Sequence, residues 1–449
     1  MKGAYPRIVV EPPGPKAKSI LERDRRVLMQ SFTRWYPLVV KRCYDFLVED
    51  VDGNVYIDLN SGIAVLNVGH AHPTVVEAVI RQVQRFTHYS LTDFAYEEAV
   101  KLAEKLVEIT PGEGEKRVFF CNSGAEAVEG SLKVARGHFR GSRPYIVAFT
   151  GSFHGRTYGA LSLTSSKPVQ RRWLGPFLPG VFHVPYPYCY RCPFKLEYPD
   201  CGIWCVDFIE EWLFRKYVPP EEVAAIIFEP IAGEGGYIVP PPEFFPRLHK
   251  LAEEYGILLV DDEVQAGMGR SGKWFAIEHW GVTPDIIAMA KALAGGLPLG
   301  AFVGRSDVMD LPPGSHASTF GGNPVSCAAA LAVIEVIEKG DLLANAEKRG
   351  REARKFFEDL AEEVEVIGDV RGLGLMIGVE LVKSRETKEP YPELLKKVLT
   401  KAFKRGVLAI GAGISVLRIA PPLSITSDAL STALEILREC LKESIKELS

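Results

Sequence analysis

Residues 258–265 read Leu-Leu-Val-Asp-Asp-Glu-Val-Gln, which places three consecutive acids directly after three large aliphatic residues. The apolar run has the length and composition of a strand buried on both faces, as in a parallel sheet. A bare carboxylate at the end of such a strand would cost several kcal/mol, or its pKa would rise until it was neutral. These acids are therefore either structural caps or part of a site that supplies a cation or hydrogen bonds.

The pattern around this segment repeats. From about residue 75 to 340, short apolar runs alternate with segments of helical period, which predicts βαβ units and a mostly parallel sheet. We expect a helix at Ala125–Ala135 and strands at Val118–Phe120, Tyr145–Phe149, Ala224–Glu229, Ile257–Asp262 and Ile286–Ala290.

The two ends of the chain have a different character. Beyond Gly340, charged helices and a few strands, such as Met376–Leu381 and Val416–Ala420, predict a smaller α+β domain. The first 50 or so residues read as irregular, proline-rich arms. We therefore expect an N-terminal arm with part of the small domain at 1–74, a large domain at 75–340 with an insertion near 186–206, and a C-terminal small domain at 341–449.

Composition excludes several classes of protein. The 449 residues carry 53 Lys and Arg against 57 Asp and Glu, a net charge of −4, and no basic stripe that would suit nucleic acid. No apolar run approaches the roughly 18 residues of a membrane span. The N-terminus lacks the apolar stretch of a signal peptide. We expect a soluble, cytoplasmic protein without nucleic-acid or membrane partners.

Four of the eight cysteines crowd into one stretch, at Cys189, Cys192, Cys201 and Cys205. This spacing could hold zinc, although the gap between the two pairs is short for a zinc ribbon. The alternative is a surface insertion whose thiols stay free or pair with one another. We expect no metal in the main site and keep zinc at these cysteines as the lesser alternative.

Two further segments contain groups that could bind a phosphate or react with a carbonyl. Asn122-Ser123-Gly124-Ala125-Glu126 follows a strand and opens a helix, so its backbone amides could seat a phosphate; by itself this motif is also an ordinary helix cap. Lys291 follows another apolar strand and is flanked by alanines. Desolvation there would lower the pKa of the amine and make it a nucleophile toward a carbonyl, although a lysine extending to solvent at a strand end is also common.

A phosphate seat, a strand-end acid and a desolvated lysine are the three protein groups that a pyridoxal phosphate site needs. The acid, Asp262, would keep the pyridine nitrogen protonated. Lys291 would hold the aldehyde and later move protons as general acid and base. Phe153 could stack on the ring face, or it could be an ordinary core aromatic.

The chain then resembles a known family, the class III (omega) aminotransferases, which have the type I pyridoxal phosphate transferase fold. The likeness runs from about Tyr56 to Leu423 and is closest to ornithine and 4-aminobutyrate aminotransferases. Its motifs are DGNVYIDLNSGIAVLNVGHAHP, FCNSGAEAVEGSLKVAR, FHGRT, FEPIAGEGG, LLVDDEVQAGMGRSG, AKALAGGLPLG, STFGGNP and VLRIAPPL. The resemblance implies a large domain with a mostly parallel seven-stranded sheet flanked by helices, a smaller α+β domain, and a homodimer or dimer of dimers with the active site at the subunit interface.

The resemblance also implies a role for each matching position. Lys291 looks like the Schiff-base lysine and Asp262 like the partner of the pyridine nitrogen, with Phe153 and Val264 on the two ring faces. The implied cofactor-binding residues are Ser123, Gly124, Ala125, Phe153, His154, Glu229, Asp262, Val264, Gln265, Lys291 and Thr319.

For the substrate, Arg418 resembles the arginine that grips the α-carboxylate of glutamate or 2-oxoglutarate. Glu234 resembles the glutamate that covers that arginine when an ω-amine is bound, although the two could also form a structural ion pair. Arg156 would hold the distal carboxylate, and Ile63 matches the small apolar version seen in 4-aminobutyrate aminotransferases.

The loop Tyr89-Ser90-Leu91-Thr92-Asp93-Phe94 complicates the choice of substrate. Thr92 and Asp93 offer a hydroxyl and an anion for a second ammonium group, such as that of ornithine or lysine. Asp93 could instead cap the helix that begins near Tyr96. We expect an ω-aminotransferase that moves the terminal amino group of L-ornithine, or of 4-aminobutyrate, to 2-oxoglutarate.

Two other function classes stay open. Some class III relatives with a YCYRCPF-type insertion look like amino-acid racemases or epimerases, because a lysine that moves protons can also reprotonate the α-carbon. A protein that binds the cofactor without turnover is the third possibility, but every expected catalytic position is filled.

Overall fold

The computed structural model describes residues 5–448, which divide into two compact units. Residues 73–343 form one unit, called here the large unit. Residues 5–72 and 344–448 form the other, the terminal unit. In the described part of the chain, no helix has both the length and the apolar character needed to cross a membrane.

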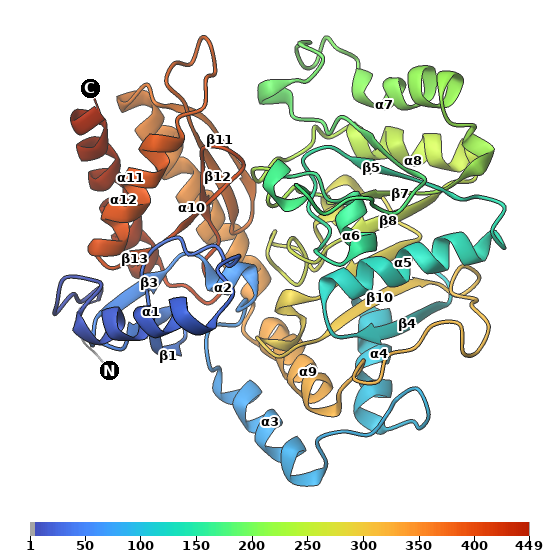
Figure 1. The fold of residues 1–449 in the computed structure, drawn as a ribbon, viewed down its shortest axis with the longest axis horizontal. Coiled ribbons are helices and arrows are strands. Elements are labelled where there is room, and N and C mark those ends of the chain that lie inside the picture. Colours follow the sequence, from blue (N-terminus) through green and yellow to red (C-terminus); the bar gives the residue numbers. More distant parts are fainter. Residues whose placement is uncertain (1–4, 449) are drawn as a thin grey trace. The chain divides into compact units, whose positions relative to one another are not determined.

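The large unit is built on a seven-stranded sheet in the order β4-β10-β9-β8-β7-β5-β6 (Figure 1). The neighbouring pairs β9–β8, β8–β7, β7–β5 and β5–β6 are parallel. Strand β10 runs antiparallel to both of its neighbours, β4 and β9. The mostly parallel seven-stranded sheet is therefore confirmed. Its strands are β4 (Lys116–Cys121), β5 (Tyr145–Phe149), β6 (Val181–Val184), β7 (Val223–Phe228), β8 (Leu258–Asp262), β9 (Ile286–Met289) and β10 (Gly300–Arg305).

The register of these strands brings their carboxyl ends to one edge of the sheet. Phe228 of β7 pairs with Asp261 of β8, and Asp262 pairs with Ala288 of β9. In open α/β sheets, ligands bind beyond the carboxyl ends of the strands. The loops that follow β5, β7, β8 and β9 therefore start side by side.

Helices cover both faces of this sheet. Ala148 and Ile227 belong to the buried cluster that includes Val128 and Leu132 of α5. Phe149 and Phe228, their neighbours in the chain, contact Phe244 and Phe245 of α8 instead. Because successive residues of a strand point to opposite faces, α5 and α8 cover opposite faces. The helices of this unit are α3 (Pro73–Arg85), α4 (Glu97–Ile109), α5 (Gly124–His138), α6 (Tyr158–Leu163), α7 (Trp204–Phe208), α8 (Phe244–Tyr255) and α9 (Pro324–Lys339).

The terminal unit has two four-stranded sheets, ordered β1-β2-β3-β13 and β11-β12-β15-β14. Its strands are β1 (Val40–Tyr44), β2 (Leu47–Asp50), β3 (Val55–Asp58), β11 (Ile367–Leu373), β12 (Met376–Leu381), β13 (Val407–Leu408), β14 (Ile410–Ala412) and β15 (Val416–Ile419). Its helical segments are α1 (Pro15–Val27), α2 (Ser61–Ala64), α10 (Leu342–Glu363), α11 (Pro392–Lys404) and α12 (Ser427–Leu448).

The interpretation of the first 50 residues as irregular was wrong. They contain α1, β1 and β2. Ala17 is the only buried residue of α1, so this helix has no apolar stripe from which its period could be recognised. Strand β1 is exposed over its first three residues and is identified by its pairing with β2, which local patterning does not reveal.

Candidate active site

A buried hydrogen-bonded pair of side chains lies at the carboxyl end of β8. The side chain of Asp262 is 3% exposed, and its Oδ2 lies 2.7 Å from Nδ1 of His154, which is fully buried. Its Oδ1 accepts a hydrogen bond from the backbone amide of Val264 at 3.1 Å. The structure thus supplies the partners that a strand-end carboxylate requires.

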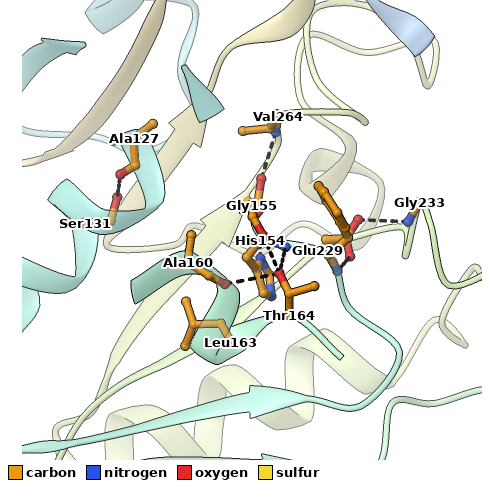
Figure 2. Close-up of polar contacts among 12 residues, drawn as sticks. Ala127, Ser131, His154, Gly155, Ala160, Leu163, Thr164, Glu229, Gly233 and Val264 are labelled. Atoms are coloured by element: carbon orange, nitrogen blue, oxygen red, sulfur yellow. Dashed lines mark hydrogen bonds and ion pairs between the residues drawn. The ribbon is translucent and has the colours of Figure 1, made fainter. Parts of the chain in front are cut away.

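The loop that carries His154 is held by Thr164 at the end of α6. The Thr164 hydroxyl accepts a hydrogen bond from the amide of His154 at 2.9 Å and lies 3.1 Å from the carbonyl oxygens of Gly155 and Ala160 (Figure 2). Ser165 accepts a hydrogen bond from the amide of Gly151. These bonds fix the backbone on both sides of Phe153 and His154.

Glu229, the first residue after β7, joins this loop to the next one. One of its carboxylate oxygens accepts a hydrogen bond from the amide of Phe153 at 2.8 Å, and the other accepts one from Gly233 at 2.9 Å (Figure 2). Burial raises the pKa of Glu229 to about 7, although the nearby His154 opposes that rise. The described contacts of Glu229 therefore tie together the backbones that follow β5 and β7.

The start of α5 has the geometry of an anion seat. Ser123 caps this 15-residue helix by accepting a hydrogen bond from the amide of Glu126, and its carbonyl accepts one from Ala127. The amides of Gly124 and Ala125 precede the first possible intrahelical acceptor, so they point out of the helix start. A Cβ on Gly124 would come within 2.7 Å of Val264, so only glycine fits here.

Lys291 stands two residues beyond the end of β9, at the same sheet edge. It is half-buried and has a φ of 40°, in the left-handed region that a lysine rarely adopts. It opens a short 3-10 helix, Lys291–Ala294, whose other residues are buried. Backbone strain of this kind often marks a functional residue.

The other predicted residues of the large unit lie in different settings. Gln265 packs on Gly233, where a glycine Cβ would come within 2.5 Å of its amide. Arg156 is exposed, and its guanidinium lies 5.4 Å from the ring centroid of Phe153. Glu234 is half-buried in the loop after β7, and Thr319 is exposed on the loop before α9.

The loop of Thr92 and Asp93 is exposed. The Thr92 hydroxyl donates a hydrogen bond to the carbonyl of Ser318 at 3.3 Å. The N-cap position of α4 belongs to Tyr96, so the alternative that Asp93 caps this helix was wrong. Among the described residues, no hydrogen bond or ion pair uses the Asp93 carboxylate.

The terminal unit contains the remaining two predicted residues. Arg418 in β15 is 2% exposed and donates a hydrogen bond from Nη2 to the carbonyl of Gly411. Ile63 lies in α2, where four consecutive residues have positive φ values, and 44% of Ile63 is exposed. A left-handed conformation costs about 1–2 kcal/mol for each non-glycine residue, so this turn holds considerable strain.

The clustered cysteines are free thiols that lie close together. All four are unpaired and line an apolar pocket together with Tyr186, Phe194 and Trp204. Within the part of the chain that the structure describes, no three His, Cys, Asp or Glu side chains have an arrangement that could hold a metal ion. Burial and the neighbouring thiols raise the pKa of Cys189 to about 11, so this thiol stays protonated near neutral pH.

Comparison with known proteins agrees with this geometry. Residues 30–441 match the family model "Aminotransferase class-III". The chain belongs to the class III aminotransferases. It is 45% identical to an alanine/serine racemase of Pyrococcus horikoshii (98% of this chain, 94% of the relative) and 42% identical to a 4-aminobutyrate aminotransferase of Mycobacterium leprae (97% and 98%). A solved Bacillus anthracis aminotransferase has a TM-score of 0.89 at 30% identity, covering 95% of this chain and 99% of that one.

Membership in this family makes the enzyme pyridoxal phosphate-dependent, and the residues present fit that cofactor. The start of α5 offers backbone amides for the phosphate, and Asp262 offers an anion for a protonated ring nitrogen. At the same edge, His154 Nε2 and Ser152 Oγ are buried with no hydrogen-bond partner among the described residues. Buried polar atoms of this kind normally have a partner, which a bound ligand or water would provide.

Thr164 and Glu126 support the site but were missed from the sequence. Glu126 reaches back from α5 to accept a hydrogen bond from the amide of Asn122 at 2.7 Å, and its own amide donates to the Ser123 hydroxyl, so the two residues fix the start of the helix. The spacing Ser123-x-x-Glu126 carries this signal and could have been recognised. Thr164 has no comparable signal, because its role depends on α6 folding back onto the loop of His154.

Asp261 and Glu263 form an acidic pair, on the face of β8 opposite Asp262. Asp261 is fully buried, and neither of its carboxylate oxygens has a donor among the described residues. Burial and the nearby Glu263 hold the pKa of Asp261 well above its usual range. Burial also raises the pKa of Glu263 to about 8. A proton shared between the two carboxyl groups would satisfy both.

This pair predicts that stability falls with rising pH. The folded chain keeps these protons at pH values where the unfolded chain has lost them, so their stabilisation is complete below about pH 4 and is lost as pH rises through about 8. Asp261→Asn should therefore be more stable than the parent at pH 9, by about 1–3 kcal/mol, with little or no gain at pH 5. Denaturant unfolding of the apoenzyme at both pH values measures this difference. Asp310→Asn, at an exposed acid, is the control, and a difference for Asp261→Asn that does not change with pH would contradict the prediction.

Proposed function

We propose that the enzyme is an ω-aminotransferase that moves the terminal amino group of L-ornithine to 2-oxoglutarate, with 4-aminobutyrate as the alternative donor. The observation that carries the choice of ornithine is the exposed, uncommitted carboxylate of Asp93. Ornithine differs from 4-aminobutyrate in its second ammonium group. An anion that is not used by the fold is the partner that such a group requires.

The burial of the Arg418 guanidinium supports the proposal that the substrate carries a carboxylate. A guanidinium with so little exposure is costly unless anions or hydrogen-bond acceptors surround it, and a carboxylate binds it through paired charge-assisted hydrogen bonds. We propose that Arg418 binds the α-carboxylate of glutamate and 2-oxoglutarate. Glu234 would neutralise it while an ω-amine is bound, and Arg156 would bind the distal carboxylate.

The other side chains of the site have the remaining proposed roles in the reaction. When bound, pyridoxal phosphate would supply an electron sink for the negative charge left on the substrate carbon. Lys291 holds and moves the proton of that carbon through its amine. The Asp262 carboxylate would bind the ring nitrogen of the cofactor, and the ring N–H of His154 keeps that carboxylate oriented. Glu229 and Thr164 keep the loop of Phe153 and His154 in place.

We further propose that two copies of the chain form a homodimer. Helix α3 exposes Val76, Ile80 and Val83 on one face, at the helical spacing of i, i+4 and i+7. Tyr89, Phe94 and Phe320 are also exposed, with 55–60% of each accessible. His88 and Phe320 are in ring contact, so the loops before α4 and before α9 meet. These six apolar residues, called here the α3 surface, suit a second copy of the chain.

A racemase or epimerase is the second candidate. The alanine/serine racemase of Pyrococcus horikoshii is 45% identical over nearly the whole chain, slightly above the 42% of the 4-aminobutyrate aminotransferase. This difference is too small to separate the two activities. The same cofactor residues serve both reactions, because a lysine that removes a proton from the α-carbon can also return one.

A single half-reaction tests the proposed function. Mixed with L-ornithine and no keto acid, the holoenzyme should convert its cofactor to the pyridoxamine form, faster than with 4-aminobutyrate, as followed by absorbance. Mixed with L-leucine or L-alanine, it should leave the optical activity of the amino acid unchanged. Loss of that optical activity, with the cofactor spectrum unaltered and no reaction with ornithine, would replace the aminotransferase proposal with the racemase.

The variant Asp93→Asn tests the substrate assignment. Removing one charge from a hydrogen-bonded ion pair should raise the KM for ornithine about tenfold while leaving the KM for 4-aminobutyrate unchanged. Steady-state kinetics with both donors measures the two effects. Glu97→Gln, at an exposed acid of α4 paired with Lys101, is the matched control. An unaltered KM for ornithine in Asp93→Asn would remove this residue from the substrate site.

The variant Ile80→Glu tests the homodimer. A buried glutamate in the middle of the α3 surface would be desolvated without a partner, so sedimentation velocity should show monomers at concentrations where the parent is dimeric. Trp212→Glu, at a 60% exposed residue outside the α3 surface, should leave the dimer intact. Dimerisation of Ile80→Glu with the affinity of the parent would show that the α3 surface is not the interface.

A further inference from the structure

The turn that presents Ile63 has an unusual backbone. Ser61, Gly62, Ile63 and Ala64 have φ values of 45°, 63°, 69° and 57°, so the chain makes one left-handed turn directly after β3. Glycine adopts this conformation easily, but isoleucine is β-branched and resists it. The surrounding structure must therefore hold the turn in place.

Asp58, the last residue of β3, fixes the start of the turn through hydrogen bonds. Its Oδ1 accepts hydrogen bonds from the amides of Asn60 at 2.8 Å and Ser61 at 3.0 Å, which lead into the turn. Its Oδ2 lies 2.8 Å from Nε2 of His70, and the side chains of Asp58 and His70 are only 3% and 13% exposed. One buried carboxylate thus joins the turn to a histidine.

The side chain of Ser61 also fixes the turn. Its hydroxyl is fully buried and donates a hydrogen bond to the carbonyl of Ala420 at 2.7 Å. Ala420 in turn donates from its amide to the carbonyl of Leu59. Because Ala420 lies two residues after Arg418, the turn is tied to the segment that carries the buried arginine.

Charges around His70 favour its protonated form. Burial alone would lower the pKa of His70, but the Asp58 carboxylate and the Cys43 thiol outweigh burial and raise the pKa to about 9. Asp58 faces His70 from β3 and Cys43 faces it from β1. Asp45, between β1 and β2, faces both His70 and His72 with a carboxyl whose pKa burial raises. His70 therefore carries a proton across the neutral range.

We propose that the Asp58–His70 pair is a positioning device, which holds the left-handed turn and thereby sets the exposed side of Ile63 against the carbon chain of the amino-acid substrate. The substrate part of this inference rests on the proposed function. The inference that the pair fixes the turn does not rest on the proposed function, because it depends only on contacts within the terminal unit. Deprotonation of His70 should loosen the turn and weaken substrate binding more than it slows turnover.

Two substitutions of His70 separate the charge from the hydrogen bond. Glutamine can still donate to Asp58 but does not titrate, whereas alanine leaves Asp58 without this donor. In the parent enzyme, the KM for the amino donor should rise several-fold as pH passes about 9, with kcat less affected. His70→Gln should lack this rise. His70→Ala should show a KM raised about three- to tenfold at every pH, the loss expected for one hydrogen bond.

Hydrogen exchange of the apoenzyme gives a readout that needs no substrate. Amides of residues 60–66 should exchange faster in His70→Ala than in the parent, and His70→Gln should restore protection. His249→Gln, at a half-buried histidine of α8, is the matched control and should change neither exchange nor KM. Unchanged exchange in His70→Ala would overturn the hold on the turn, whatever reaction the enzyme catalyses.

Ile63→Ala tests the contact with substrate separately. It removes apolar surface while keeping a residue in the turn, so the KM for the active amino donor should rise while exchange of residues 60–66 stays near that of the parent. An unchanged KM in Ile63→Ala would overturn the substrate contact. Failure of the proposed function itself would be recognised differently, as a holoenzyme that does not convert its cofactor with any amino donor.

Discussion

The hydrogen bond between Asp262 and His154 is the constraint on which the active site depends. A carboxylate at the end of a fully buried strand needs compensation, and the structure supplies it with an imidazole at 2.7 Å and a backbone amide at 3.1 Å. To bring His154 there, the loop after β5 must turn back over the sheet edge. Thr164 and Glu229 hold that loop from two sides, so the buried charge and the loop geometry require each other.

Two of the residues with proposed functions have a strained backbone. Lys291 and Ile63 both have positive φ values, and neither is a residue that adopts them easily. In each case a β-strand whose last residues are buried ends a few residues before the strained residue, at Met289 and at Asp58. The rigid strands determine where the strained residue lies, and the strain is compensated by packing and hydrogen bonds elsewhere in the same unit.

Much of the large unit could be predicted from the sequence because its strands are apolar, short and separated by helices. The strands at 145–149 and 258–262 were recognised within one residue, and Asp262, Ser123 and Lys291 stand at the expected strand and helix ends. The helix α1 was missed because it buries one residue. Thr164 and the left-handed turn at 61–64 were missed because both depend on contacts between segments distant in the sequence. The ligand roles of these residues, and the domain boundaries after residues 74 and 340, stay predictions.

The antiparallel strand β10 has a consequence for how the chain folds. In this sheet, β9 and β10 are the only paired neighbours that run antiparallel with no long helix between them, so residues 290–299 connect them along one edge. Closing so short a loop loses little chain entropy, whereas each parallel pairing must close a longer crossover connection. We therefore expect the β9–β10 hairpin to form early on the folding pathway. The loop of Lys291 would then acquire its shape before the rest of the site exists.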